Sequence, residues 1–240
     1  MRLASEERQL ALDLPHVEAS SLDDFMPAPS NRAALDAVLA WPAWPSPLLI
    51  LDGPPGCGKT HLARIWAGRA DALTLGAAQV WDVVDPLARL GRALALVVDD
   101  ADQVEDERLL FHLYNLLVER RGSLLLTARR PLGEWDVRLP DLRSRLGTAW
   151  CVPIGAPAEP LLAAVLVKQF GDRQLRVEPG VVELLARQME RSFAAAGRIV
   201  RRLDGLSLRS GRPVGVGLAR AVLRERAVEA AAHSPGTERP

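Results

Sequence analysis

The sequence of 240 residues has little cysteine, no long apolar run and no excess of charge of either sign. Its two cysteines, Cys57 and Cys151, have neither metal-ligand spacing nor a disulfide framework, which favours a reducing compartment. There is no apolar run of about 18 residues and no signal-peptide pattern, so no membrane span is expected. Lys plus Arg and Asp plus Glu both total 30, so no overall basic charge indicates nucleic acid. We therefore expect a cytoplasmic protein with no membrane association.

The strongest signal is the stretch LLILDGPPGCGKTHLARIW, from Leu48 to Trp66. GPPGCGKT fits the pattern G-x-x-x-x-G-K-[ST] between an apolar run and a helix-favouring run, where a phosphate-binding loop must stand. Its glycines let successive backbone N–H groups turn toward a phosphate, and the following helix adds the positive end of its dipole. Lys59 is expected to reach the β- and γ-phosphates and Thr60 to ligate magnesium. A glycine-rich turn that binds nothing is the alternative.

Two acidic residues end the apolar run LALVVDD, where an open parallel sheet presents its ligands. Asp99 would hold magnesium through water, and Asp100 could orient a hydrolytic water. A turn or a helix cap explains two such acids equally well when they stand alone, but the phosphate-loop motif favours the metal site. Thr127 ends the run SLLLTA and could sense a γ-phosphate, or its hydroxyl could simply cap the strand end.

The segment LPDLRSRLG places Arg143 and Arg145 just before the last expected strand. An arginine leaving a helix here can project into a neighbouring subunit's nucleotide, as an arginine finger does. The alternative is a surface salt bridge.

Near the N-terminus, QLALDLP alternates Leu10, Leu12 and Leu14 with smaller or polar residues after Gln9 and stops at Pro15. This pattern predicts an extended tail that could dock three leucines into a groove. A disordered tail or an edge strand is the alternative.

Short apolar runs alternate with helical stretches up to Pro157, after which only helix-periodic segments follow. The expected strands lie at 48–51, 72–76, 94–100, 123–128 and 149–154, and the later helices at 158–171, 179–190, 193–209 and 216–231. The alternation predicts an α/β fold with a five-stranded, mostly parallel sheet, followed by a small all-helical domain. We divide the chain into a tail at 1–20, a nucleotide-binding domain at 21–156, a helical domain at 157–231 and a disordered tail at 232–240.

Taken together, these motifs resemble a known family. GPPGCGKTHL, the strand ending in two aspartates, TARRP and LPDLRSRL resemble, in order, the P-loop AAA+ core of the replication initiator DnaA. DDFMPAPSN resembles that group's segment before the first helix. The LPDL-SRL form, the short length and the N-terminal leucine motif are most similar to the regulatory inactivators of DnaA, the Hda group. The resemblance spans about residues 9 to 228.

The resemblance assigns roles to individual residues. Asn31 would border the adenine, Arg145 would be the finger that completes the site of DnaA, and the helical domain would be the AAA+ lid. The residues expected at the phosphates are Gly53, Gly56, Cys57, Gly58, Lys59, Thr60 and His61; those of the clamp-binding motif are Gln9, Leu10, Leu12 and Leu14. Asp99 and Asp100 match the acids that follow the strand in this family, with Asp99 and Thr60 at the magnesium.

The family's activity implies ADP or ATP with Mg²⁺ as cofactors, and DnaA and the polymerase III sliding clamp as partners. A protein of this kind sits on DNA-loaded clamp, promotes ATP hydrolysis by DnaA and so prevents a second round of initiation. After about Arg226 too few residues remain for a helix-turn-helix module, so DNA contact is expected to be indirect.

Two positions depart from the family pattern. Arg129 in TARRP stands where an aspartate is usual, and Ala194 stands where the lid arginine is usual, leaving Arg198 one turn later as the candidate replacement. Both departures favour nucleotide binding over turnover. Two alternatives remain open, namely a self-assembling ATPase of the helicase-loader type and a non-catalytic adaptor with a structural nucleotide.

Overall fold

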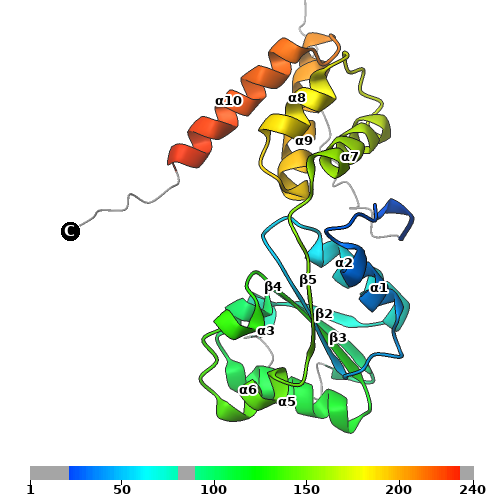
Figure 1. Ribbon diagram of the computed structural model, residues 1–240, viewed down its shortest axis with the longest axis vertical. Helices are drawn as coiled ribbons and strands as arrows, with labels where there is room; N and C mark the ends of the chain where they lie inside the picture. The colour runs from blue at the N-terminus through cyan, green and yellow to red at the C-terminus, as the bar shows by residue number, and fades with distance from the viewer. Residues whose placement is uncertain (1–21, 81–89, 233–240) are drawn as a thin grey trace, which may run out of the picture.

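The computed structural model describes residues 22–80 and 90–232, which form an α/β part and a helical part joined at residues 154–158 (Figure 1). The α/β part contains η1 (Leu22–Asp24), α1 (Arg32–Leu39), β1 (Leu48–Asp52), α2 (Lys59–Ala70), β2 (Leu73–Gly76), α3 (Ala77–Val80), β3 (Ala95–Asp99), η2 (Ala101–Gln103), α5 (Glu107–Glu119), β4 (Ser123–Ala128), η3 (Leu132–Glu134), α6 (Pro140–Leu146) and β5 (Trp150–Pro153). The helical part contains α7 (Glu159–Asp172), α8 (Val181–Gln188), α9 (Phe193–Ser210) and α10 (Val216–Ala232).

The sheet has five strands in the order β2-β3-β4-β1-β5, and all of its pairings are parallel. The predicted α/β class is therefore confirmed. Leu126 of β4 is level with Ile50 of β1 on one side and with Val98 of β3 on the other. Because the strands are parallel, the loops that follow β1, β3 and β4 leave the same edge of the sheet side by side.

Helices cover both faces of the sheet, and side chains that alternate along each strand divide between two apolar clusters. Leu48 and Ile50 belong to the cluster under α5 and α6, whereas Leu49 and Leu51 pack against α1 and α2. The second cluster contains Trp66, which is fully buried. Its ring stacks on Trp44 at a centroid distance of 5.0 Å, so Trp66 is a core residue.

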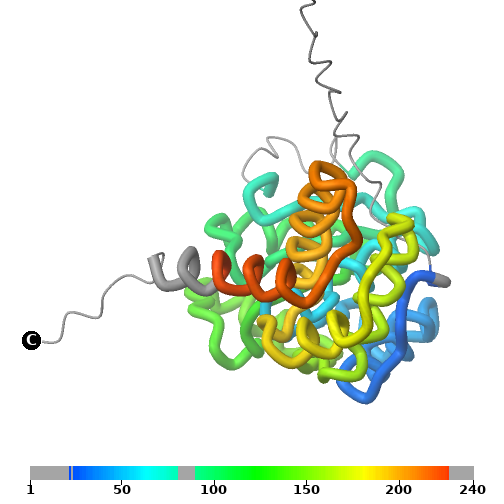
Figure 2. The backbone as a smooth tube through the Cα atoms, turned by 90° about the horizontal axis from the view of Figure 1, so that it is seen from above, coloured from blue at the N-terminus to red at the C-terminus, as the bar shows by residue number. Residues whose placement is uncertain are grey.

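The helical part has an apolar core of its own, to which α7, α8, α9 and α10 all contribute. An ion pair between Lys168 of α7 and Asp24 of η1, 2.8 Å long, joins it to the α/β part. Seen from above, α7 and α9 lie over the α/β part (Figure 2). None of the helices within 22–80 and 90–232 combines the length and the hydropathy that a membrane crossing requires.

Several sequence predictions lie outside the described residues. They are the tail at 1–20 with Gln9, Leu10, Leu12 and Leu14, and the disordered tail from 233 onward.

We expect Leu125→Ala, in the centre of β4, to lower the free energy of unfolding by about 2–5 kcal/mol, because it removes a fully buried side chain beside a packed helix. Denaturant unfolding measures the change. Val118→Ala, on the exposed side of α5, is the control and should change stability by less than about 0.5 kcal/mol. Equal effects of the two substitutions would contradict this description of the core.

Candidate functional site: a phosphate loop with paired acids

The loop Gly53 to Gly58 joins β1 to α2 and has a shape that only glycine permits at two positions. Gly56 has a φ of 72°, and a Cβ there would lie 2.6 Å from the Cβ of Ser192 in the helical part. A Cβ on Gly53 would collide with the carbonyl oxygen of Ile154. Backbone and helical part thus approach the loop too closely for any side chain.

An ammonium group and backbone N–H donors lie together at the loop. Lys59 is 6% exposed, and its Nζ donates to the carbonyl oxygens of Gly53 (2.7 Å) and Pro54 (3.0 Å). Gly58 caps α2 without a side-chain bond, so the first N–H groups of this helix have no side-chain acceptor. A buried ammonium group beside a helix N-terminus is an arrangement that binds phosphate oxygens.

Cys57 lies at the base of the same loop and is almost completely buried. Burial raises the pKa of its thiol, and the Lys59 ammonium lowers it by a smaller amount. The thiol is therefore neutral at physiological pH, and the side chain fills space under the loop.

Thr60 and Asp99 meet across the sheet edge. The Thr60 hydroxyl donates to the two carboxylate oxygens of Asp99 at 3.0 and 3.2 Å. These are oxygen ligands of the type that Mg²⁺ prefers, and the ion usually binds two protein oxygens together with phosphate and water. The predicted metal ligands are thus side by side.

Thr127 is fully buried, and its hydroxyl is used inside the protein. It donates to the carboxylate of Asp99 and accepts from the backbone N–H of Asp100 at 2.9 Å. In this arrangement it fixes the two acids that follow β3. Its role as a γ-phosphate sensor stays a prediction.

Asp100 is held by an arginine that the motifs did not connect with it. Its backbone is left-handed, at φ 55° and ψ 45°, and its carboxylate accepts from Arg129 Nη2 at 2.7 Å and Nε at 3.3 Å. The hydrogen bond and the charge of Asp100 raise the pKa of the Arg129 guanidinium. The sequence contains the signal, an Arg after β4 and an Asp after β3, but their contact depends on the strand order.

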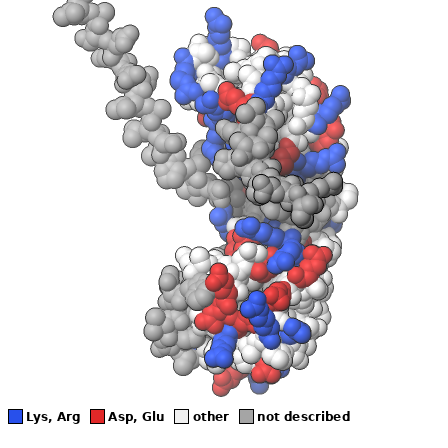
Figure 3. Space-filling model, turned by 90° about the vertical axis from the view of Figure 1, so that its left-hand side faces the viewer, with Lys and Arg blue, Asp and Glu red and all other residues white. Residues whose placement is uncertain are grey.

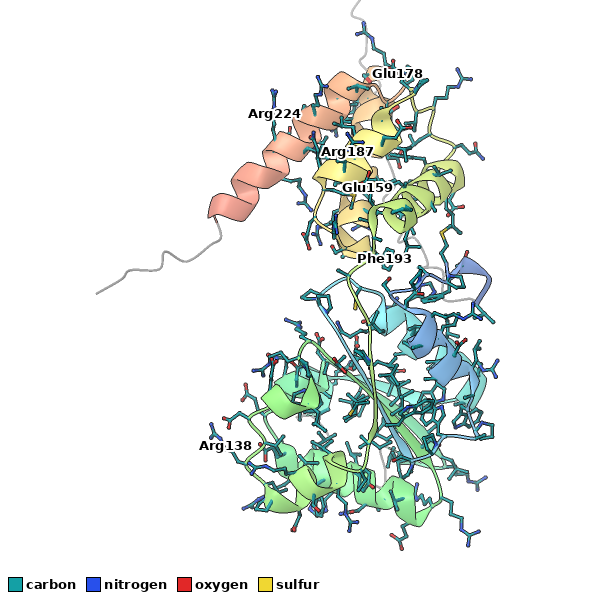
Figure 4. All side chains as sticks on the ribbon, in the orientation of Figure 1. Arg138, Glu159, Glu178, Arg187, Phe193 and Arg224 are labelled. Carbon is teal, nitrogen blue, oxygen red and sulfur yellow. The ribbon has the colours of Figure 1, made fainter. Side chains whose placement is uncertain are left out.

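The N-terminus of α9 lies against the phosphate loop, and Figure 4 shows Phe193 at the junction of the two parts. Phe193 N–H donates to the carbonyl of Gly56 at 2.8 Å. Ala194, the position that the resemblance matches to a lid arginine, lies beside the same glycine and has only a methyl group there. Arg198, the candidate replacement, pairs with Glu190 at 3.3 Å.

Asn31, predicted to border the adenine, shapes the segment before α1. Its Oδ1 accepts from the N–H of Ala28 at 2.7 Å, and its Nδ2 donates to the carbonyl of Met26 at 3.1 Å. The adjoining Phe25 meets the ring of His61 edge to face at a centroid distance of 5.5 Å. His61 thereby connects the first turn of α2 to this segment.

The two arginines of α6 differ in their contacts. Arg143 donates through both Nε and Nη2 to the carbonyl of Val137. Arg145 is exposed, and its guanidinium has no hydrogen-bond or ion-pair partner among the described residues. It lies on a helix remote from the helical part (Figure 1), so the structure does not bring it to the chain's own phosphate loop.

The assembled groups fit a nucleoside polyphosphate with magnesium. Lys59 and the N–H groups of α2 would hold phosphate oxygens, while Thr60 and Asp99 would hold the ion. Bound magnesium would neutralise charge on the phosphates. The protein's own contribution is to hold these donors and carboxylates at one sheet edge.

Known structures identify the architecture. Domain III of the replication initiation protein DnaA from Thermotoga maritima superposes with a TM-score of 0.75 at 16% identity, over 86% of this chain and 96% of that one. The fold is that of the AAA+ proteins. AMPPCP-bound DnaA from Aquifex aeolicus matches with a TM-score of 0.68 at 19% identity, over 90% of this chain and 74% of that one.

Sequence comparison points to the same relatives. The chromosomal replication initiator protein DnaA of Cutibacterium acnes is 25% identical over 230 residues, covering 85% of this chain. The chain spans only 46% of that relative's length. No protein-family model matches the chain. The similarity in sequence and in fold is thus to DnaA proteins, and it does not distinguish an initiator from an inactivator.

Asp52 ends β1 directly before the loop and is 7% exposed. Burial raises the pKa of its carboxyl above the usual value, and its own backbone and Lys59 oppose this rise. A raised pKa in the folded state means that the folded protein binds this proton more tightly than the unfolded chain. The resulting stabilisation is present below the unfolded pKa of about 3.9 and is lost as pH rises through the folded pKa.

We therefore expect Asp52→Asn to stabilise the protein more at pH 7 than at pH 4. At pH 7 the wild type must bury a charged carboxylate, whereas the variant buries a neutral amide. Thermal unfolding of both proteins at the two pH values measures the difference. Glu119→Gln, at an exposed position on α5, is the control for the loss of a surface carboxylate. If Asp52→Asn raised the unfolding temperature less at pH 7 than at pH 4, this would contradict the expectation.

Proposed function

We propose that the chain is a nucleotide-bound AAA+ regulator of the Hda type. Tethered to the DNA-loaded sliding clamp, it would stimulate ATP hydrolysis by DnaA and so prevent over-initiation of chromosome replication. The bound nucleotide would be ADP or ATP with Mg²⁺. The observation that carries the proposal is the exposed guanidinium of Arg145, which has no partner among the described residues, while Lys59, Thr60 and Asp99 gather at a different place.

Nucleotide binding is supported by the convergence of three elements on one sheet edge. Lys59 supplies the cation, the start of α2 supplies backbone donors, and Asp99 with Thr60 supplies metal ligands. The similarity to AMPPCP-bound DnaA adds to this support. Weak or absent turnover is favoured by Ala194, which offers no charge to the phosphates.

Arg145 is suited to act on another molecule. Leu142 and Leu146 bury one side of α6 in the core of the α/β part, so the helix is a rigid support. Arg143 is occupied by the Val137 carbonyl, which leaves Arg145 as the arginine of this helix that can reach outward. An arginine supplied in trans stabilises the charge that develops on a transferring phosphoryl group.

The tether is proposed from the sequence, because Gln9, Leu10, Leu12 and Leu14 lie outside the described residues. An extended segment with alternating leucines suits a hydrophobic groove. Contact with DNA would be indirect, through clamp and DnaA. The same exposed arginine could also complete a site in a second copy of this chain, which is the geometry that a self-assembling ATPase of the loader type requires.

Nucleotide binding predicts a thermal shift. At a concentration of about 100 Kd a ligand stabilises the folded state by about 2.7 kcal/mol, so ADP or ATP with Mg²⁺ should raise the unfolding temperature measurably. Lys59→Ala should lose this shift. Lys168→Ala, at the chain's other lysine, should retain it, because Lys168 pairs with Asp24 and Asp172 away from the loop. Equal shifts in both variants would place the nucleotide elsewhere.

The regulatory role predicts that the purified chain accelerates ATP hydrolysis by DnaA in the presence of clamp-loaded DNA. Arg145→Ala should reduce the stimulation by a factor of about 10³ or more, because the transition state loses its cation. Gln9→Ala should weaken it by removing the tether. Single-turnover hydrolysis of ATP prebound to DnaA measures both effects.

Arg138→Ala is the matched control, since Arg138 is an exposed arginine just before α6 (Figure 4). It should leave the stimulation nearly unchanged, and an equal loss would indicate a general charge effect instead of a finger. A chain that leaves DnaA unaffected but hydrolyses ATP by itself would replace this proposal with the loader-type function.

A further inference from the structure

Arg129 and Asp100 each follow one of two neighbouring strands. Arg129 is the first residue after β4, and Asp100 is the first after β3. The register that pairs Val98 with Leu126 brings the two strand ends to the same level. The carboxylate therefore meets the guanidinium through both of its oxygens, at 2.7 and 3.3 Å.

The backbone on either side fixes this pair. Asp102 accepts from the N–H of Arg129 at 3.2 Å and pairs with the side chain of Arg130 at 3.6 Å. Asp100 is anchored through its own N–H, which donates to Thr127. Both chain segments are thus held in place, and the guanidinium of Arg129 is directed to Asp100 alone among the described acids within hydrogen-bond distance. A bidentate arginine–carboxylate contact is stronger and more directional than a single hydrogen bond.

The pairing separates by function the acid that ends β3, Asp99, from the acid that follows it, Asp100. Asp99 faces Thr60 and Thr127 and stays available to a metal. Asp100 accepts from Arg129 through both of its oxygens, and these bonds use acceptor positions that a water would otherwise take. Nucleotide binding and hydrolysis therefore depend on different carboxylates in this chain.

We infer that Arg129 is a latch on Asp100 that withdraws this carboxylate from water activation, so that the protein holds a nucleotide without hydrolysing it. The inference rests on the proposed function and assigns a residue to its low turnover. In hydrolysis the water oxygen bonds to the γ-phosphorus while the bond from that phosphorus to the β–γ bridging oxygen breaks. The water proton passes to a carboxylate, and ADP and phosphate result. The latch removes that proton acceptor.

Opening the latch tests the inference. Arg129→Ala should raise kcat for ATP by about tenfold or more, because a positioned base contributes roughly 10²–10⁴-fold to such a step. KM and the Kd of a fluorescent ADP analogue should stay within about twofold, since the nucleotide ligands are unchanged. Arg129→Gln, which keeps most of the side-chain length, should act in the same direction. The rates are measured in the full chain with Mg²⁺ under single-turnover conditions.

Two controls identify the source of the gain. Arg130→Ala removes the adjacent arginine, which pairs with Asp102 instead, and should leave kcat unchanged. Asp100→Asn added to Arg129→Ala should abolish the gain. A gain that persists without Asp100, or that Arg130→Ala reproduces, would overturn the inference.

Other outcomes separate this inference from the proposal beneath it. If Arg129→Ala binds the analogue normally but kcat does not rise, the latch is overturned and nucleotide binding stands. If ATP binding weakens more than tenfold, Arg129 contacts the nucleotide and the latch is likewise overturned. If the wild type binds neither nucleotide, the proposed function fails, and the latch fails with it.

Discussion

The buried hydroxyl of Thr127 joins the ends of β3 and β4, and the candidate site depends on this junction. It donates to Asp99 and accepts from the N–H of Asp100, so one side chain orients the metal-binding carboxylate and the turn after it. The parallel register makes the contact possible, because β4 lies between β3 and β1. The phosphate loop then follows β1 at the same edge, within reach of Asp99 through Thr60.

Charge is distributed unevenly over one face of the molecule. On the face shown in Figure 3, basic side chains predominate on the helical part, while acidic side chains gather, together with basic ones, on the α/β part. Although the net charge of the sequence is zero, this face therefore has two regions that differ in charge. Such surfaces steer a partner's orientation more than they add to its affinity.

The fold could be predicted from the sequence because each signal was local. Apolar runs gave the strands, helical periodicity gave α7 to α10, and the glycine pattern gave the loop. Contacts between distant segments could not be predicted in the same way. To predict the pairing of Arg129 with Asp100, one must know the strand order. To predict that Arg143 is hydrogen-bonded and Arg145 is not, one must know where the Val137 carbonyl lies. The roles of these residues stay predictions, although the structure brings Thr60 together with Asp99.

The hydrogen bond from Phe193 to Gly56 joins the helical part to the phosphate loop through main-chain atoms. A side chain that senses a phosphate works by charge, and salt weakens it when it is exposed. Here the contact is uncharged, and it is backed by the methyl group of Ala194 and the ring of Phe193. The shape of the loop thus sets the position of α9 directly, and this mechanical coupling should persist at ionic strengths that screen an exposed charged contact.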